Sequence, residues 1–380
     1  MLHRIASRHA APLAFAVLTA AFASMLPPYA RADDLDEAVR AVEQATDAEL
    51  LDELQRRRDE LRDAAKAAGE GLTGRDVQTG LRRLDDQTLA KAVRVVEGNG
   101  RVIYGPDDRK DWHEIEDEAV KRLASASVAL FAAVQLEAEG AGALKLKTAP
   151  LGERADLLGK GETLCPEERF AKQATGAFCS GTLVKEDMVL TAGHCVREIS
   201  ANGNLPYITA VSFVFGYRVE QPGSPGTTSI ARQQVFKGRQ VEGGELSGGR
   251  GRDWALVRLE HPVPAALAAP VTRWRSAAPT QGQGVFVIGY PSGLPLKYAP
   301  GASVRDTSDP AYFVANLDTF GGNSGSGVYD TATGELAGVL VRGETDYVRY
   351  KGEACVRAYA CPTSGCRGED VTRIAIVPKP

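Results

Sequence analysis

The sequence predicts an all-β fold of barrel or sandwich type over its C-terminal part, preceded by a helical N-terminal segment. From about residue 178 onward, short apolar runs alternate with Gly/Pro turns, which is the pattern of many short strands. Residues 33–98 contain neither Pro nor Cys, and their leucines and valines recur at three- and four-residue steps or multiples of them, the period of an amphipathic helix. With 43% hydrophobic residues, the 380-residue chain can bury a sizeable core.

Residues 1–32 are predicted to be a signal peptide. Arg4 and Arg8 precede an apolar run from Ala10 to Leu26, and Ala30-Arg31-Ala32 forms a small-x-small cleavage site. The alternative is a buried or membrane-anchoring helix, although the run is shorter than the roughly 18 apolar residues of a spanning helix. The protein is therefore expected to be secreted, into the periplasm or the medium, with no membrane association after signal removal.

Charge and cysteine content agree with export. Cleavage would remove three arginines and no acid, which shifts the formal net charge from −4 to −7. An acidic protein without a clustered Lys/Arg stripe is not expected to bind nucleic acid. The six cysteines all follow the signal peptide and suit an oxidising compartment.

Two segments lie between the signal peptide and the main domain. Residues 33–98 are expected to form a helical hairpin packed on the main domain, or alternatively a pro-segment or partner-binding arm. Residues 99–164 form a transitional segment, in which Val102–Tyr104 is predicted to be a strand and Glu116–Ala138 a helix. The main domain is placed at residues 165–380. Its predicted strands are Thr182–Val184, Val189–Thr191, Val211–Phe215, Trp254–Leu259, Val285–Ile288, Tyr312–Leu317, Leu336–Val341 and Ile374–Val377.

Three residues of this domain predict nucleophilic catalysis. A serine hydroxyl is a weak nucleophile that needs a base, and the base needs an orienting partner. His194 ends an apolar strand beside small residues, Asp253 opens an apolar run, and Ser324 is framed by glycines. Taken singly, they also fit a strand-end histidine, a strand-capping carboxylate and a flexible loop. Their combination in the order His–Asp–Ser favours a catalytic triad over these structural roles.

The histidine region carries a family resemblance. Phe178–Val184 and Val189–Cys195 resemble the corresponding region of trypsin- and chymotrypsin-like serine peptidases, and the interval of 16 residues between Cys179 and Cys195 matches that family's disulfide beside the histidine. Asp253–Leu256 resembles the family's aspartate segment.

The serine region is most similar to a bacterial branch of that family. Gly322–Ser326 and Ile288–Pro291 resemble the branch that includes the staphylococcal glutamyl endopeptidase. The resemblance covers about residues 165–345 and leaves residues 33–98 uncovered. It implies two antiparallel six-stranded β-barrels, the chymotrypsin-like double barrel, with a triad between them.

The roles of the site residues follow from this resemblance. His194, Asp253 and Ser324 are expected to be catalytic, and the N–H groups of Gly322 and Ser324 to form the oxyanion hole. The implied activity is that of a serine endopeptidase, which acts on peptides or proteins without a cofactor or metal. A second hypothesis is a catalytically silent homologue that acts as a binding protein. The oligomeric state is left open.

Specificity is predicted from two residues. Asp318 lies six residues before Ser324, the spacing of the aspartate that binds Arg or Lys in trypsin-like enzymes; alternatively it caps a turn or pairs locally. Arg342 is expected to approach the same pocket and neutralise it. Glutamate-specific relatives use a histidine near Leu340, and none is present there.

The cysteines depart from the family pattern. Phe320 stands where the family has a half-cystine four residues before the serine, so the second-barrel disulfide is expected to be missing. The four cysteines other than Cys179 and Cys195 allow three connectivities. A zinc site is the alternative, against which their irregular spacing argues. These four are Cys165, Cys355, Cys361 and Cys366.

Overall fold

The computed structural model describes residues 99–100, 103–158, 162–197, 208–246, 252–344, 346–350, 353–363 and 365–380. The predicted signal peptide and the predicted helical segment 33–98 lie outside these residues. The two barrels described below belong to one compact unit, Asn99–Tyr347 with Ala354–Pro380. Within the described ranges, no helix has both the length and the apolar character needed to cross a bilayer.

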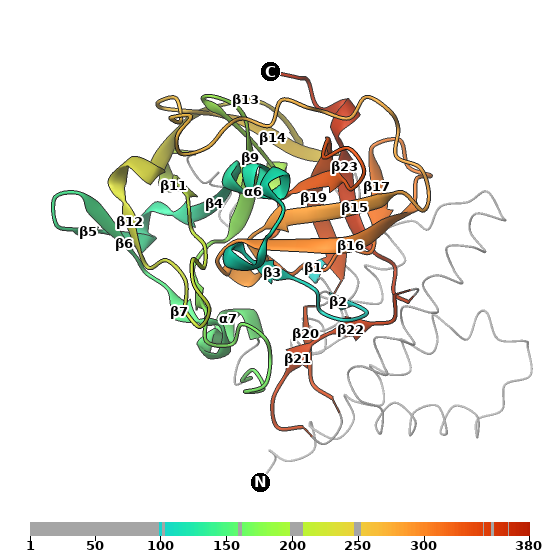
Figure 1. Ribbon diagram of the computed structural model, residues 1–380, viewed down its shortest axis with the longest axis horizontal. Helices are drawn as coiled ribbons and strands as arrows, with labels where there is room; N and C mark the ends of the chain where they lie inside the picture. The colour runs from blue at the N-terminus through green and yellow to red at the C-terminus, as the bar shows by residue number, and fades with distance from the viewer. Residues whose placement is uncertain are drawn as a thin grey trace, which may run out of the picture. The chain divides into compact units, whose positions relative to one another are not determined.

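The first barrel is a closed antiparallel sheet with the strand order β10-β14-β13-β11-β4-β9 (Figure 1). Its strands are β4 (Ser127–Ala132), β9 (Cys179–Lys185), β10 (Met188–Thr191), β11 (Val211–Phe215), β13 (Val235–Leu246) and β14 (Asp253–Leu259). Most of these runs are apolar, and Leu130, Phe213 and Val257 are among the buried side chains that fill this region. The closed sheet leaves no strand edge unpaired along the ring, which removes a route to aggregation.

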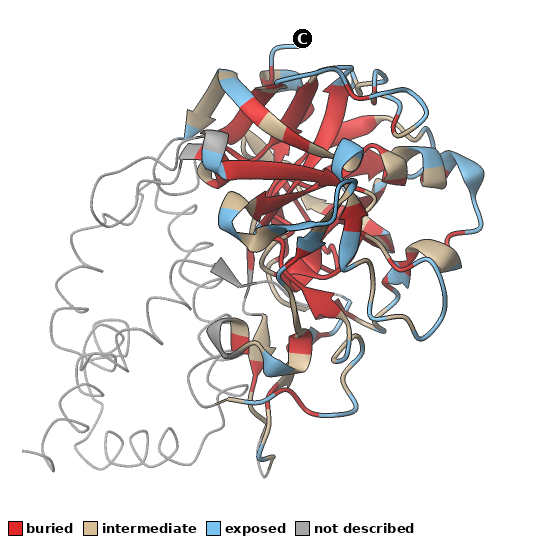
Figure 2. Ribbon diagram, turned by 90° about the vertical axis from the view of Figure 1, so that its left-hand side faces the viewer, coloured by how far each residue is buried: buried red, intermediate tan, exposed pale blue. Residues whose placement is uncertain are grey.

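The second barrel is a six-stranded ring that closes because β19 pairs with both β18 and β23. Its strands are β15 (Gly284–Gly289), β16 (Lys297–Asp306), β17 (Tyr312–Ala315), β18 (Gly327–Asp330), β19 (Leu336–Glu344) and β23 (Glu369–Arg373). A second cluster of buried apolar side chains, including Val287, Phe313 and Leu340, fills its core. The two-barrel prediction is confirmed, and Figure 2 shows that much of the barrel strands is buried, although most residues of β13 are half-buried or exposed.

The other elements are short. The remaining strands are β1 (Asn99–Gly100), β2 (Ile103–Tyr104), β3 (Lys110–Asp111), β5 (Leu136–Glu139), β6 (Ala143–Leu146), β7 (Ala149–Pro150), β8 (Ala174–Thr175), β12 (Ser229–Ala231), β20 (Tyr347–Val348), β21 (Arg357–Ala358) and β22 (Ala360–Cys361). The helices are α6 (Glu118–Ser125), α7 (Ala155–Leu158) and α8 (Gly193–Arg197), with 3-10 turns η1 (Trp112–Glu114), η2 (Ala133–Gln135), η3 (Leu151–Glu153), η4 (Ile208–Ala210), η5 (Arg232–Gln234), η6 (Pro291–Gly293) and η7 (Ile374–Ile376).

The helix predicted over Glu116–Ala138 is wrong in its second half. The helix α6 ends at Ser125, and Ser127–Ala132 is strand β4 of the first barrel, buried along nearly its whole length. A continuous apolar run has no periodicity that separates a buried strand from a buried helix. The first barrel therefore begins well before residue 165, where the sequence placed the start of the peptidase domain.

The strand predicted over Ile374–Val377 is also wrong. The last barrel strand, β23, ends at Arg373, and the chain then makes the 3-10 turn η7, closed by a bond from the N–H of Val377 to the carbonyl of Ile374. Ile374 and Val377 are both buried, and this spacing of three residues places side chains on one face of a 3-10 turn.

Residues 103–111 precede the first barrel in sequence but contact the second barrel. The strand β3 pairs with β16, with Asp111 opposite Lys297, and these two side chains form a buried ion pair of 2.6 Å. The strand β2 pairs in parallel with β22. These contacts bring Tyr104 to the loop that precedes Ser324, as described next.

Candidate active site

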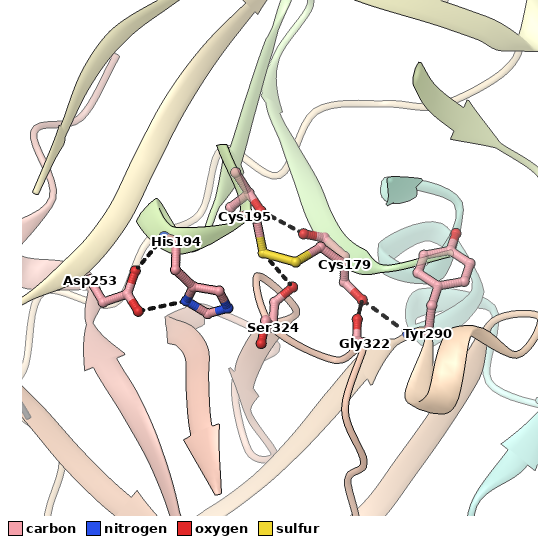
Figure 3. Close-up of a disulfide and its surroundings, with 9 residues drawn as sticks. Cys179, His194, Cys195, Asp253, Tyr290, Gly322 and Ser324 are labelled. Atoms are coloured by element: carbon pink, nitrogen blue, oxygen red, sulfur yellow. Dashed lines mark hydrogen bonds and ion pairs between the residues drawn. A yellow bond between two sulfur atoms is a disulfide. The ribbon is translucent and has the colours of Figure 1, made fainter. Parts of the chain in front are cut away.

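Three segments meet between the barrels. His194 lies on α8, directly after β10, and Asp253 is the first residue of β14. Ser324 lies in the loop between β17 and β18 of the second barrel. In Figure 3 the imidazole of His194 lies between Asp253 and Ser324. The structure thus brings together the three residues that were predicted to form the triad.

The pairing of β10 with β14 places His194 beside Asp253. Thr191 at the end of β10 is opposite Ala255, so the helix that follows begins next to the first residue of β14. Asp253 accepts two hydrogen bonds from His194: one from its backbone N–H to Oδ1, 3.1 Å, and one from Nδ1 to Oδ2, 2.7 Å. A Cβ on Gly193 would lie 2.6 Å from the carbonyl oxygen of Glu245, so only glycine permits this approach.

The two side chains differ in exposure, as acid and base of a triad require. The Asp253 side chain is 3% exposed and the His194 side chain 32% exposed. A carboxylate on Nδ1 fixes the tautomer in which Nε2 carries the lone pair. The exposed edge of the imidazole can then accept a proton from a neighbouring hydroxyl.

Groups from the second barrel surround Asp253. Nη1 of Arg342 lies 3.7 Å from its Oδ2, and the hydroxyl of Thr372 donates to its backbone carbonyl, 2.8 Å. Burial by itself would raise the pKa of Asp253, but the hydrogen bonds from His194 and the charges of His194 and Arg342 outweigh burial and hold the pKa below its ordinary value. Asp253 is therefore an anion at neutral pH.

The loop that carries Ser324 is held by backbone hydrogen bonds. Ser324 is 8% exposed, and its carbonyl accepts from the N–H of Ser180, 2.7 Å. The N–H of Asn323 donates to Phe320, 3.0 Å, and that of Gly325 to Leu340, 2.7 Å. Gly322 has a positive φ of 91°. Among the described residues its N–H has no hydrogen-bond acceptor, which leaves it available to a ligand oxygen.

Arg342, which was predicted to approach the specificity pocket, forms ion pairs with two aspartates. Besides Asp253, its guanidinium contacts Asp370, with 3.3 Å between Nε and Oδ2. Asp370 lies directly opposite Arg342 where β19 pairs with β23. The cation whose charge acts on Asp318 is Arg109, whereas Arg342 forms its ion pairs with Asp253 and Asp370.

Asp318 is buried, and only one of its two carboxylate oxygens accepts a hydrogen bond from the described residues. It is 5% exposed, and its Oδ1 accepts the backbone N–H of Tyr104, 2.7 Å. Its Oδ2 has no hydrogen-bond partner among the described residues. Burial raises the pKa of Asp318 to about 7, although the Tyr104 N–H and the charge of Arg109 act in the opposite direction. Tyr104 is 214 positions away in sequence, so this bond is a long-range contact and differs from the local pairing considered from the sequence.

All six cysteines are paired, as Cys165–Cys355, Cys179–Cys195 and Cys361–Cys366. The second of these joins β9 to α8 beside the candidate triad (Figure 3). Disulfide sulfurs lack the thiolate that zinc requires, so the zinc alternative has no ligands here. Phe320, in place of the family's half-cystine, stacks on Tyr347 with 5.0 Å between ring centroids and lies under the guanidinium of Arg109.

Three residues that contact the site residues or Arg342 were not predicted from the sequence, namely Ser180, Thr372 and Asp370. Ser180 stands inside the motif Cys179-Ser180-Gly181, but no local pattern relates it to a loop more than 140 residues away. Thr372 and Asp370 lie on β23. The sequence predicted a strand in this region, but placed it over Ile374–Val377, beyond both residues. Such contacts depend on how the barrels pack, which a linear pattern does not encode.

Comparisons with known proteins agree with this geometry. The family described as "Trypsin-like peptidase domain" matches residues 179–339. The glutamyl endopeptidase of Bacillus licheniformis is 24% identical over 163 residues, which make up 41% of this chain and 46% of that protein. The match thus spans about half of that relative's length.

Two solved structures are similar at low identity. A Glu endopeptidase in complex with MPD aligns with a TM-score of 0.41 and 16% identity, covering 72% of this chain and 94% of that one. Human heparin binding protein aligns with a TM-score of 0.37 and 15% identity, covering 53% and 82% of the two chains. Residues 179–339 thus match the trypsin-like peptidase domain, and the chain shows distant homology to bacterial glutamyl endopeptidase.

Proposed function

We propose that this protein is a secreted serine endopeptidase that cleaves peptide bonds in protein substrates through an acyl-enzyme on Ser324. The observation that carries the proposal is the imidazole of His194, which is bonded through Nδ1 to a buried carboxylate and lies between that carboxylate and Ser324. This is the arrangement in which a hydroxyl, a base and an orienting group act as one unit.

The reaction follows from the roles of these groups. Oγ of Ser324 attacks the scissile carbonyl carbon while Nε2 of His194 takes the hydroxyl proton, and Asp253 stabilises the imidazolium that forms. The oxyanion of the tetrahedral intermediate accepts hydrogen bonds from the N–H groups of Gly322 and Ser324. His194 then protonates the leaving amine. Water repeats the sequence on the acyl-enzyme, which releases the acid product and restores Ser324.

Secretion is supported by two features. The N-terminal sequence has the basic start, apolar run and small-x-small site of a signal peptide. The three disulfides leave no cysteine reduced, and such bonds persist in oxidising compartments. Localisation of the protein fused to its own first 32 residues, compared with the same protein lacking them, tests this part.

A preference for cleavage after Arg or Lys is the finer part of the proposal and depends on Asp318. Its Oδ2 is buried and has no hydrogen-bond partner among the described residues, so a substrate cation could pair with it. Replacement of Asp318 by Asn is expected to lower kcat/KM for Arg and Lys substrates much more than for Ala or Leu substrates. An equal effect on both substrate classes would assign Asp318 to the structural role that its long-range bond to Tyr104 indicates.

The experiment that tests the proposal is active-site labelling with a fluorophosphonate probe, followed by identification of the labelled peptide. We expect the wild-type protein to be labelled on Ser324 and the Ser324→Ala variant to be unlabelled and inactive. Ser326→Ala is the matched control, because Ser326 belongs to the same glycine-rich segment but its hydroxyl is bonded to Oδ1 of Asn323, 3.2 Å. A folded wild-type protein that is never labelled would support the silent-homologue hypothesis.

A further inference from the structure

Ser180 contacts both residues whose N–H groups are proposed to bind the oxyanion. This serine lies on β9 of the first barrel and is fully buried. Its backbone N–H donates to the carbonyl of Ser324, 2.7 Å, and its hydroxyl donates to the carbonyl of Gly322, 2.7 Å. One residue of the first barrel therefore binds two carbonyls of the serine loop in the second.

The Ser180 side chain is itself fixed in direction. Its Oγ accepts a hydrogen bond from the backbone N–H of Tyr290, 3.1 Å, which leaves its single hydroxyl proton for the carbonyl of Gly322. Its own carbonyl accepts the hydroxyl of Thr191, 2.7 Å, from the neighbouring strand β10. In Figure 3, Gly322 lies on the side of the disulfide that faces Tyr290, where this network converges.

Gly322 needs such an anchor because its own residue type supplies none. Its φ of +91° is accessible mainly to glycine, and a Cβ there would lie 2.7 Å from the carbonyl oxygen of Tyr290. Glycine lets the two peptide units that flank it rotate freely, so its N–H keeps one direction only if both units are tethered. The preceding unit is tethered where the carbonyl of Gly321 accepts from the N–H of Ser292, 2.5 Å. The following unit is tethered at its carbonyl by the hydroxyl of Ser180 and at its N–H by the carbonyl of Phe320.

We propose that Ser180 is a positioning residue for the oxyanion hole. Its hydroxyl restrains the peptide unit after Gly322, and its backbone N–H restrains the unit after Ser324. These units adjoin the two that carry the donor N–H groups, so the contacts limit the rotation of both donors before substrate binds. Such preorganised donors stabilise the transition state more than the bound substrate. The inference depends on the proposed endopeptidase function and adds to it a side chain that never touches substrate.

The test is a comparison of Ser180→Ala with Ser127→Ala. Ser127, on β4 of the same barrel, is also buried, but its hydroxyl has no hydrogen-bond partner among the described residues, so the control makes the same chemical change without removing a contact. We expect Ser180→Ala to lower kcat on the order of tenfold to a hundredfold with little change in KM. This effect lies between that expected for losing one buried hydrogen bond and that expected for losing a donor of the oxyanion hole. Ser127→Ala should keep both constants near wild type.

A second readout separates positioning from general loss of structure. A peptide aldehyde forms a tetrahedral adduct with the nucleophile and places an oxygen in the oxyanion hole, so its affinity should fall in parallel with kcat in Ser180→Ala. The Ser180→Thr variant keeps a hydroxyl donor and should recover most of both values if Ser180→Ala proves poorly folded.

Two results would overturn the assignment. One is a folded Ser180→Ala variant with wild-type kcat and aldehyde affinity; the other is a defect confined to KM or shared equally by Ser127→Ala. Absence of labelling in the wild-type protein would instead overturn the proposed function itself, so the two failures can be told apart.

Discussion

Arg342 and Asp253 form an ion pair that joins the two barrels behind His194. Nη1 of Arg342, on β19, lies 3.7 Å from Oδ2 of Asp253, on β14, which is the same oxygen that accepts from Nδ1 of His194. The guanidinium also contacts Asp370, which pairs in turn with Arg367. The negative charge of the Asp253 carboxylate is therefore partly compensated by the guanidinium of Arg342, and the same carboxylate orients the imidazole of His194.

Removal of this cation should shift the pH dependence of catalysis. The charge of Arg342 helps to hold the pKa of Asp253 below its ordinary value, so in Arg342→Met a higher pH is needed to bring the His194–Asp253 pair into its active form. We expect the acid limb of the kcat/KM profile to move up by as much as about one pH unit. Arg342→Lys, which retains a cation, should leave the limb near its wild-type position. An unchanged limb in a folded Arg342→Met variant would show that the pair is only structural.

Replacement of Asp253 by Asn should abolish most activity without unfolding the protein. An amide in place of the carboxylate favours the wrong imidazole tautomer, and in Ser-His-Asp triads this substitution costs about 10⁴-fold in kcat. Stopped assays at pH 7 with a peptide ester or amide substrate measure the loss, and circular dichroism provides the folding control. Activity within tenfold of wild type would contradict the assignment of Asp253.

Asp318 should make the folded protein less stable as the pH rises. Its pKa is about 7 in the folded chain and about 3.9 in an unfolded one, so between these values the unfolded state releases a proton that the folded state keeps. The stability linked to this group is therefore complete below about pH 4 and is lost as the pH rises through 7. Thermal melts at pH 5 and pH 8 should show a smaller decrease in Asp318→Asn than in wild type. Equal decreases would mean that Asp318 is ionised in the fold.

Activation should not depend on a newly freed N-terminal amine. In trypsin-like zymogens that amine pairs with an aspartate directly before the serine, but here the position is Asn323, whose Oδ1 accepts from Ser326 and whose N–H bonds Phe320. Proteins that begin at several positions between Asp33 and Asn99, each with a free or acetylated N-terminus, should have similar specific activity. Activity confined to one free N-terminus would refute this.

Site residues that stand in short sequence motifs could be identified from the sequence. Residues that contact the site only because distant strands pack together could not. His194, Asp253 and Ser324 stand in short motifs whose residue types follow from backbone constraints, such as the glycine that lets α8 approach Glu245. The strand β4 was mistaken for helix because it is buried on both faces and so shows no alternation. The ion-pair partners of Arg342, Asp253 on β14 and Asp370 on β23, were not predictable because both pairs depend on how distant strands pack. The pairing of the last four cysteines likewise needed the fold.

The bond between Cys165 and Cys355 closes a covalent ring, since the two cysteines are 190 positions apart in sequence. His194, Asp253 and Ser324 all lie inside that ring, as does every strand of the first barrel except β4. A protein with the proposed endopeptidase activity is exposed to that activity, and one cut of the backbone anywhere inside a ring opens the ring without dividing the molecule. Singly cleaved protein would thus migrate as one species until it is reduced, and the three candidate triad residues would stay covalently linked to one another.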